Sequence, residues 1–453
     1  MRVPVAPPSL ADVAEGLSSA RLAAVLVSGV RADDHGRYRH WDTLRHVSPP
    51  AGLSAHEWWL AIQSARRVLR RELPLRTTSG QPFAYALTDA AHEMLQRIDQ
   101  QAAGRLTAPE QVTNPHVRDR YVISSLIEEA ITSSQLEGAS STRQVAKEML
   151  RTGRAPRDRS ERMIFGNYHA MELVRQWRDR RLTPEMVCDL HRVATEGTLR
   201  NPSAAGRVQT PDEERVTVLW SDGTVLHRPP PAEQLPGRLE AMCRFANGDQ
   251  VEGFLHPVVR AILLHFWLAY DHPFEDGNGR TARALFYWSM LSQGLWLTEF
   301  LSISSILRGA PARYARSFLY TETDAGDTTY FILSQLRVIC RAIDALNEYL
   351  SRKATEVAEV EALLRRAPGF NHRQLALLGH ALRTPGAEYT YASHARSHGV
   401  VHQSARTDLI GLRQQGLLDR TVRGTTHRYF APLDLERRLR AIAASRARPS
   451  ASD

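Results

Sequence analysis

The stretch His272-Pro-Phe-Glu-Asp-Gly-Asn-Gly-Arg-Thr-Ala-Arg283 lies between two segments whose apolar residues recur at helical spacing. Within it, Gly277, Asn278 and Gly279 form a loop whose backbone can approach a ligand closely. A helix is predicted to begin at this loop. Because the free N–H groups and the positive end of a helix attract anions, the loop indicates a phosphate-binding site.

Charged and titratable side chains flank the loop. Arg280 and Arg283 are three residues apart and are expected to share one helix face. Two cations in the first turn oppose the helix dipole at about 0.3–1 kcal/mol each unless an anion compensates them, and such local conflicts are typical of functional sites. Asp276 is a hard oxygen ligand suited to Mg²⁺ that is held mainly by phosphates and water. His272 can act as a base near neutral pH.

This stretch resembles the signature of the Fic family, His-x-Phe-x-Asp/Glu-Gly-Asn-Gly-Arg-x-x-Arg, with every defined position filled. The resemblance extends upstream to His256-Pro257 and Gly206-Arg207 and covers about residues 119–351. Residues 40–59 resemble extensions found in some Fic proteins. The resemblance implies a mainly α fold, a Fic helical core with a small β-hairpin flap.

The resemblance also implies a reaction, the transfer of AMP from ATP to a Ser, Thr or Tyr hydroxyl of a target protein. His272 accepts the proton of that hydroxyl, whose oxygen attacks the α-phosphate, and pyrophosphate leaves. Asp276 holds the Mg²⁺ that bridges the α- and β-phosphates. Such chemistry needs mainly positioning and charge stabilisation.

The family pattern assigns separate roles around the nucleotide. Backbone groups of Asn278 and Gly279 hold the phosphates, Arg280 and Arg283 neutralise the outer ones, and Phe274 is a core residue that fixes the loop. The nucleotide-binding residues implied are Phe274, Gly277, Asn278, Gly279, Arg280 and Arg283.

A hairpin is predicted over residues 215–228, where β-branched residues flank Asp222-Gly223 and the prolines at 229–231 end the second strand. The segment 216–226 resembles the Fic flap that aligns a target segment by strand pairing. The alternative is a hairpin that only covers the core.

An inhibitory segment is predicted upstream. Residues 119–138 carry an apolar helical stripe, with Gly138 as the C-terminal cap. Glu137 lies in the last turn, where the helix dipole disfavours a carboxylate unless a cation is near. The segment, with Ser133, Glu137 and Gly138, resembles the Fic inhibitory motif, which implies that Glu137 pairs with Arg283 and blocks the γ-phosphate position. Some relatives use this Glu to remove AMP, so the reverse reaction stays open.

Bulk composition is that of a globular protein, with 43% hydrophobic and 24% charged residues. The longest apolar run, residues 261–270, is too short to span a bilayer, and the N-terminus lacks a secretion signal. The three cysteines, Cys188, Cys243 and Cys340, are far apart and are expected to be reduced core residues. These features predict a cytoplasmic protein without membrane partners.

The C-terminal part combines basic charge with a recognisable element order. From Arg383 onward there are twelve arginines against six acidic residues. Helices are predicted over residues 391–397 and 404–415, followed by two strands around Gly424. That order predicts a winged helix-turn-helix. If it binds DNA, Arg406 and Thr407 would reach base edges, and Arg423 and Arg428 would contact phosphates.

The predicted organisation is an N-terminal extension (1–110), a Fic domain (111–351) with the inhibitory helix at about 119–138, a helical connector (352–371), the winged helix-turn-helix (372–440) and a tail (441–453). The leading function is an autoinhibited protein adenylyltransferase. The alternative is a DNA-binding regulator whose Fic domain modifies itself or senses ATP. Transfer of another nucleotide, the de-AMPylating reaction and a homodimer stay open.

Overall fold

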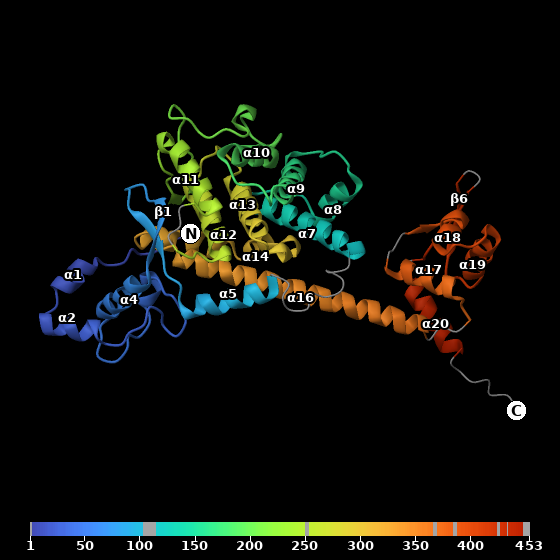
Figure 1. The fold of residues 1–453 in the computed structure, drawn as a ribbon, viewed down its shortest axis with the longest axis horizontal. Coiled ribbons are helices and arrows are strands. Elements are labelled where there is room, and N and C mark those ends of the chain that lie inside the picture. The colour runs from blue at the N-terminus through green and yellow to red at the C-terminus, as the bar shows by residue number, and fades with distance from the viewer. Residues whose placement is uncertain are drawn as a thin grey trace. The chain divides into compact units, whose positions relative to one another are not determined.

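The computed structural model describes residues 2–102, 115–249, 253–365, 369–383, 387–423, 426–432 and 434–446. In these ranges the protein is mainly α-helical, as the sequence predicted, with three small sheets (Figure 1). The chain divides into two compact units, Met1–Leu346 and Asn347–Asp453. The predicted boundary at 110/111 and residues 447–453 of the predicted tail lie outside the described residues.

The first hundred residues contain more structure than the sequence indicated. The elements are α1 (Leu10–Glu15), α2 (Ser19–Leu26), α3 (Trp41–Leu44), α4 (Ala55–Leu69), β1 (Arg71–Arg76), β2 (Pro82–Tyr85) and α5 (Asp89–Ala102). Helix α4 begins with a capping box, in which Ser54 and Glu57 each bond the other's backbone N–H. Trp58 and Trp59 are buried and pack in the core.

This N-terminal segment is built into the same unit as the helical core. The guanidinium of Arg66 is fully buried, and its Nη1 donates to the Tyr330 hydroxyl at 2.8 Å. In β2, the Ala84 N–H donates to the Gly326 carbonyl at 3.1 Å, and the Thr328 N–H donates to the Ala84 carbonyl at 2.8 Å. Because these bonds are buried and directional, they fix β2 against the chain that precedes α16.

The core consists of packed helices. They are α7 (Pro115–Leu136), α8 (Arg143–Thr152), α9 (Arg159–Gln176), α10 (Pro184–Thr195), α11 (Leu235–Asn247), α12 (Pro257–Asp271), α13 (Asn278–Ser292), α14 (Ile303–Arg308), α15 (Pro311–Thr323) and α16 (Thr329–Arg365). Helices α12 and α13 pack together at the centre (Figure 1). Helix α12 is apolar almost all round, which is the pattern of a helix surrounded by protein.

The remaining strands and the end of α16 refine two predictions. Strands β3 (Val218–Leu219) and β4 (Val225–His227) pair antiparallel, so the predicted hairpin is present but shorter than residues 215–228. Helix α16 is continuous over 37 residues. The predicted connector therefore begins inside this helix and is not a separate element up to Arg365.

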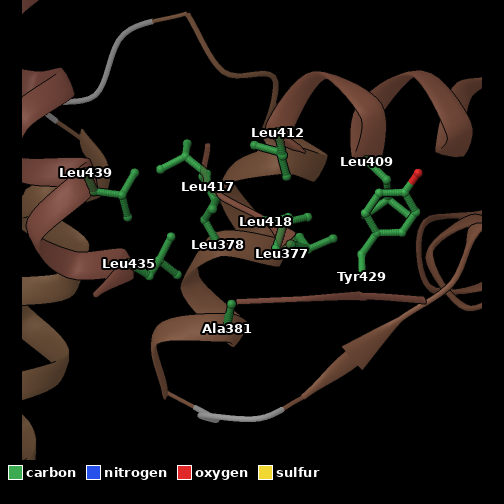
Figure 2. Close-up of a cluster of buried hydrophobic side chains, with 10 residues drawn as sticks. All are labelled: Leu377, Leu378, Ala381, Leu409, Leu412, Leu417, Leu418, Tyr429, Leu435 and Leu439. Atoms are coloured by element: carbon green, nitrogen blue, oxygen red, sulfur yellow. The ribbon is translucent and has the colours of Figure 1, made fainter. Parts of the chain in front are cut away.

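The C-terminal unit has its own core. Its elements after α16 are α17 (His372–Arg383), β5 (Glu388–Tyr389), α18 (Tyr391–His398), α19 (His402–Gln414), β6 (Asp419–Arg423), β7 (Thr426–Phe430) and α20 (Leu435–Arg446). The two predicted helices and the predicted hairpin are present, although its turn at Gly424 lies outside the described residues. Figure 2 shows the buried cluster Leu377, Leu378, Ala381, Leu409, Leu412, Leu417, Leu418, Tyr429, Leu435 and Leu439.

Two details of this unit were not predicted. Strand β5 joins the hairpin to give a three-stranded sheet in the order β5-β7-β6. Helix α20 runs past the predicted domain end at residue 440. The assignment as a winged helix-turn-helix stays a prediction. No helix among the described residues is long and apolar enough to cross a membrane.

Replacing Trp59 by Ala is expected to destabilise the Met1–Leu346 unit by about 3–5 kcal/mol, because a large buried aromatic leaves a cavity. Trp59 is only 1% exposed. Urea denaturation followed by circular dichroism measures the change. Val27→Ala is the control, since Val27 is 81% exposed. Equal stability of the two variants would contradict the packing role of Trp59.

Candidate active site

The signature residues form the junction between α12 and α13. His272 ends α12 in the left-handed conformation with φ 47°, and Gly277 precedes α13 with φ 83°. The Asn278 side chain closes the loop, because its Oδ1 accepts from the Phe274 N–H at 3.0 Å and its Nδ2 donates to the Phe274 carbonyl at 2.7 Å. The side chain of Asn278 is therefore used within the loop, and only its backbone is left for a ligand.

Two glycines of the loop have no space for a side chain. A Cβ at Gly277 would lie 2.4 Å from Cγ2 of Thr195 on α10. A Cβ at Gly279 would lie 2.2 Å from Oε1 of Glu137. The start of α13 is thus in direct contact with α10 and with the segment that follows α7.

The imidazole of His272 is oriented for proton acceptance. Its Nδ1 is 3.2 Å from the Ala269 carbonyl oxygen. Since a carbonyl only accepts, Nδ1 carries the proton and Nε2 keeps its lone pair. Burial lowers the pKa of His272 to about 4, so the ring is neutral at pH 7.

A second histidine supports the loop, and no pattern in the sequence indicated it. The ring of His191, on α10, stacks on Phe274 with centroids 3.8 Å apart. Its Nε2 donates to the Asp276 carbonyl at 2.7 Å, and its Nδ1 accepts from the Gly206 N–H at 2.9 Å. Burial lowers the pKa of His191 to about 4, which suits this neutral tautomer.

Arg280 is a buried cation with unused donors. It is fully buried, and its Nη1 donates to the Ala194 carbonyl. Its Nε and Nη2 have no partner among the described residues. Nη2 lies 3.4 Å from the position a Gly277 Cβ would take, so one unused donor is beside the loop. Burial lowers the pKa of Arg280, and a bound anion would compensate this charge.

Asp276 lies at the edge of the site. Its side chain is 45% exposed, and its Oδ2 pairs with Nη2 of Arg159 at 3.3 Å. Its Oδ1 accepts from the Gly277 N–H at 2.6 Å. A single accessible carboxylate beside a phosphate loop fits Mg²⁺, which takes its other ligands from phosphates and water. The sequence did not indicate that Arg159 neutralises this carboxylate.

Arg283 contacts the segment that the sequence predicted to be inhibitory. Its Nε donates to the Ser133 hydroxyl at 2.9 Å, and its Nη2 donates to the Ser133 carbonyl at 3.0 Å and to Oε1 of Glu137 at 2.8 Å. Gly138 follows with φ 89° and ends the turn. Arg280 and Arg283 therefore use different neighbours: Arg280 contacts α10, whereas Arg283 contacts α7.

The base of the β3–β4 hairpin is hydrogen-bonded to the chain around His272. Nη2 of Arg215 donates to the carbonyls of Asp271 and His272 at 2.8 and 3.1 Å, and its Nε donates to the Pro230 carbonyl at 2.9 Å. The hairpin thus has a fixed position relative to His272.

The part of the chain that contains this site is similar to known proteins. Residues 181–290 match the family model described as Fic/DOC family. Residues 181–290 are a Fic domain. A protein adenylyltransferase Fic from Nematostella vectensis is 27% identical over 199 residues, which are 43% of this chain and 43% of that protein. A protein of the same name from Drosophila grimshawi is 37% identical over 82 residues, 18% of this chain and 16% of that protein.

The matched part of the chain thus spans less than half of the length of these curated relatives. A crystal structure of a Fic family protein from Desulfovibrio desulfuricans G20 aligns with 77% of this chain and 98% of that chain, with a TM-score of 0.52 and 21% identity. This likeness shows that the Fic fold is shared.

The support that His191 gives to the Fic loop predicts a pH signature. Its pKa is about 4 in the folded protein against an ordinary 6.5. The stability that it contributes is therefore fully present above pH 6.5 and is lost as the pH falls toward 4. Between pH 7 and 5, the slope of unfolding free energy against pH is expected to be lower in His191→Asn by up to about 1.4 kcal/mol per pH unit.

Urea denaturation at pH 7, 6 and 5 tests this expectation. The control is His35→Asn, because the His35 side chain is 98% exposed. A slope in His191→Asn equal to that of the parent protein would show that His191 is not held neutral.

Proposed function

We propose that this Fic domain is a protein adenylyltransferase, which transfers AMP from ATP to a hydroxyl side chain of another protein. The proposal depends on one observation: a neutral His272 imidazole lies at the start of a loop that has unused hydrogen-bond donors of Arg280 beside it. The relatives named protein adenylyltransferase Fic support the same reaction class.

His272 would act first as the base. The target hydroxyl gives its proton to Nε2 while its oxygen forms a bond to the α-phosphorus of ATP. The bond between that phosphorus and the oxygen bridging to the β-phosphate breaks, and pyrophosphate leaves. The negative phosphates raise the pKa of a nearby imidazole, so the ring becomes a stronger base once ATP is bound.

The remaining loop residues would hold the phosphates. The N–H groups at the start of α13 and the unused donors of Arg280 suit the negative oxygens. Asp276 is the residue that would hold Mg²⁺, which supplies charge neutralisation of the phosphates. Arg159, now paired with Asp276, would have to release that carboxylate.

Glu137 would restrain this reaction. Arg283 is only 2% exposed, and its fork is used by Glu137 and Ser133. A γ-phosphate that needs Arg283 must first displace the Glu137 carboxylate. The Glu137 carboxylate and the γ-phosphate of the nucleotide would therefore compete for Arg283.

Glu137→Ala is expected to raise AMP transfer about tenfold or more, because the fraction of molecules able to bind ATP productively increases. Transfer of label from ATP in a cell lysate measures the effect. Glu128→Ala is the matched control, since Glu128 lies on α7, which ends just before Glu137, and pairs with Arg143 instead. Equal labelling by the two variants would rule out the inhibitory role.

A second experiment tests the chemistry and the donor. In the Glu137→Ala background, labelled ATP, UTP and CTP are supplied in turn, and His272→Ala is expected to lower labelling by about 10²-fold or more. Label on a discrete band that disappears with His272→Ala supports the reaction. Labelling that survives this change would overturn the assignment of His272 as the base.

A DNA-binding role for the C-terminal unit is a second candidate, because Arg406 and Thr407 are exposed on α19 whereas Asp408 and Leu409 on the opposite face are buried. Arg406→Ala is expected to weaken duplex DNA binding by about 1–3 kcal/mol if it contacts a base. Arg440→Ala on α20 is the control. Absence of binding by the parent protein at about 50 mM salt would exclude this role.

A further inference from the structure

A pocket of about 220 Å³ lies between α14, α15 and α16, outside the loop that carries the Fic signature. Four arginines line it: Arg313 and Arg316 from α15, and Arg337 and Arg341 from α16. No acidic residue is among its lining residues. The space is sufficient for several water molecules and hence for a polyatomic ligand.

The four arginines are exposed to solvent at the pocket rim, and none of them forms an ion pair with a residue that the structure describes. The acid nearest along α16, Asp344, is paired with Arg97 from α5. Burial lowers the pKa of Arg337, and the positive charge of Arg313 lowers it further. Like charges gathered without a counter-ion are unfavourable, so an anion in the pocket would relieve their repulsion.

The walls of the pocket are aromatic and apolar. Tyr314, Tyr320 and Tyr330 contribute rings, and Leu307 and Leu333 contribute aliphatic surface. Guanidinium groups bind phosphate oxygens in a two-pronged geometry, and a largely apolar wall with a few charged groups is typical of small-ligand sites.

The pocket is distinct from the candidate active site, although it adjoins it. None of residues 272–283 lines it. Tyr314 is the link, because its ring lines the pocket while its hydroxyl is hydrogen-bonded to Nε2 of His265 at 2.8 Å. Burial raises the pKa of Tyr314 to about 12, and the charges of Arg283 and Glu137 also act on it.

We propose that this pocket, formed by Arg313, Arg316, Arg337 and Arg341 over a tyrosine-lined wall, binds a small molecule that carries two or more phosphate groups. Four cations from two helices exceed what a single carboxylate would need. The phosphates would contact the guanidinium groups at the pocket rim, and any organic part would lie on the tyrosines.

Titration calorimetry of the full chain with inorganic pyrophosphate tests the proposal. The pocket variant Arg316→Gln/Arg337→Gln is expected to bind pyrophosphate about tenfold more weakly than the parent protein at this site. The charge-matched control is Arg178→Gln/Arg181→Gln, whose side chains are 52% and 68% exposed and lie outside the pocket. A third variant, Arg280→Gln, shows how much of the binding heat comes from pyrophosphate bound at the Fic loop and not in the pocket.

The same variants are then titrated with ADP to distinguish the two sources of phosphate. Tighter binding of ADP that is lost in the pocket variant indicates a nucleotide, and equal binding of both compounds indicates that the phosphates alone are recognised. Pyrophosphate binding by the pocket variant as strong as in the parent protein overturns the proposal. Because Arg316 and Arg337 are outside the catalytic loop, AMP transfer measured in parallel reports on the proposed function separately.

Discussion

A buried cation joins the two helices on which the site depends. Arg283, on α13, donates to the hydroxyl and backbone carbonyl of Ser133 on α7 and to the carboxylate of Glu137, which follows α7. Burying a guanidinium is costly unless its donors are hydrogen-bonded. Helix α7 must therefore keep its position against α13 as long as no other anion replaces the carboxylate of Glu137. The same residue that would receive a phosphate thereby also determines where α7 packs.

A second buried residue strengthens this attachment. Glu129, two turns earlier on α7, is 1% exposed, and its carboxylate accepts from the N–H and hydroxyl of Ser304 and from the hydroxyl of Ser302. It thus binds the start of α14, where free N–H groups are available. Burial raises the pKa of Glu129, which shows that desolvation outweighs these hydrogen bonds. Both contacts lie in the C-terminal half of α7, so this half of the helix is held against α14 and against the start of α13.

The sequence predicted local features of the protein better than the contacts between distant segments. The loop at residues 272–283 and the Asp222-Gly223 hairpin were predictable because their determinants are adjacent in the chain. His191 and Arg159 were not, since their partner Asp276 is 85 and 117 residues away. Strand β5 was not predicted because a strand of two residues is too short to show an alternation of apolar and polar residues. The signature located the site, but the residues that support it come from packing.

The absence of a side chain at Gly279 has a consequence for how this family member can change. Its α-carbon is covered by the carboxylate of Glu137, so the residue that leaves the backbone open to a ligand also makes room for this acid. Any larger residue there would displace the Glu137 carboxylate and change the glycine loop at once. Under the role proposed for Glu137, natural variants that lose its restraint but keep the reaction should therefore carry their changes on α7 or in the turn after it, and not in the glycine loop.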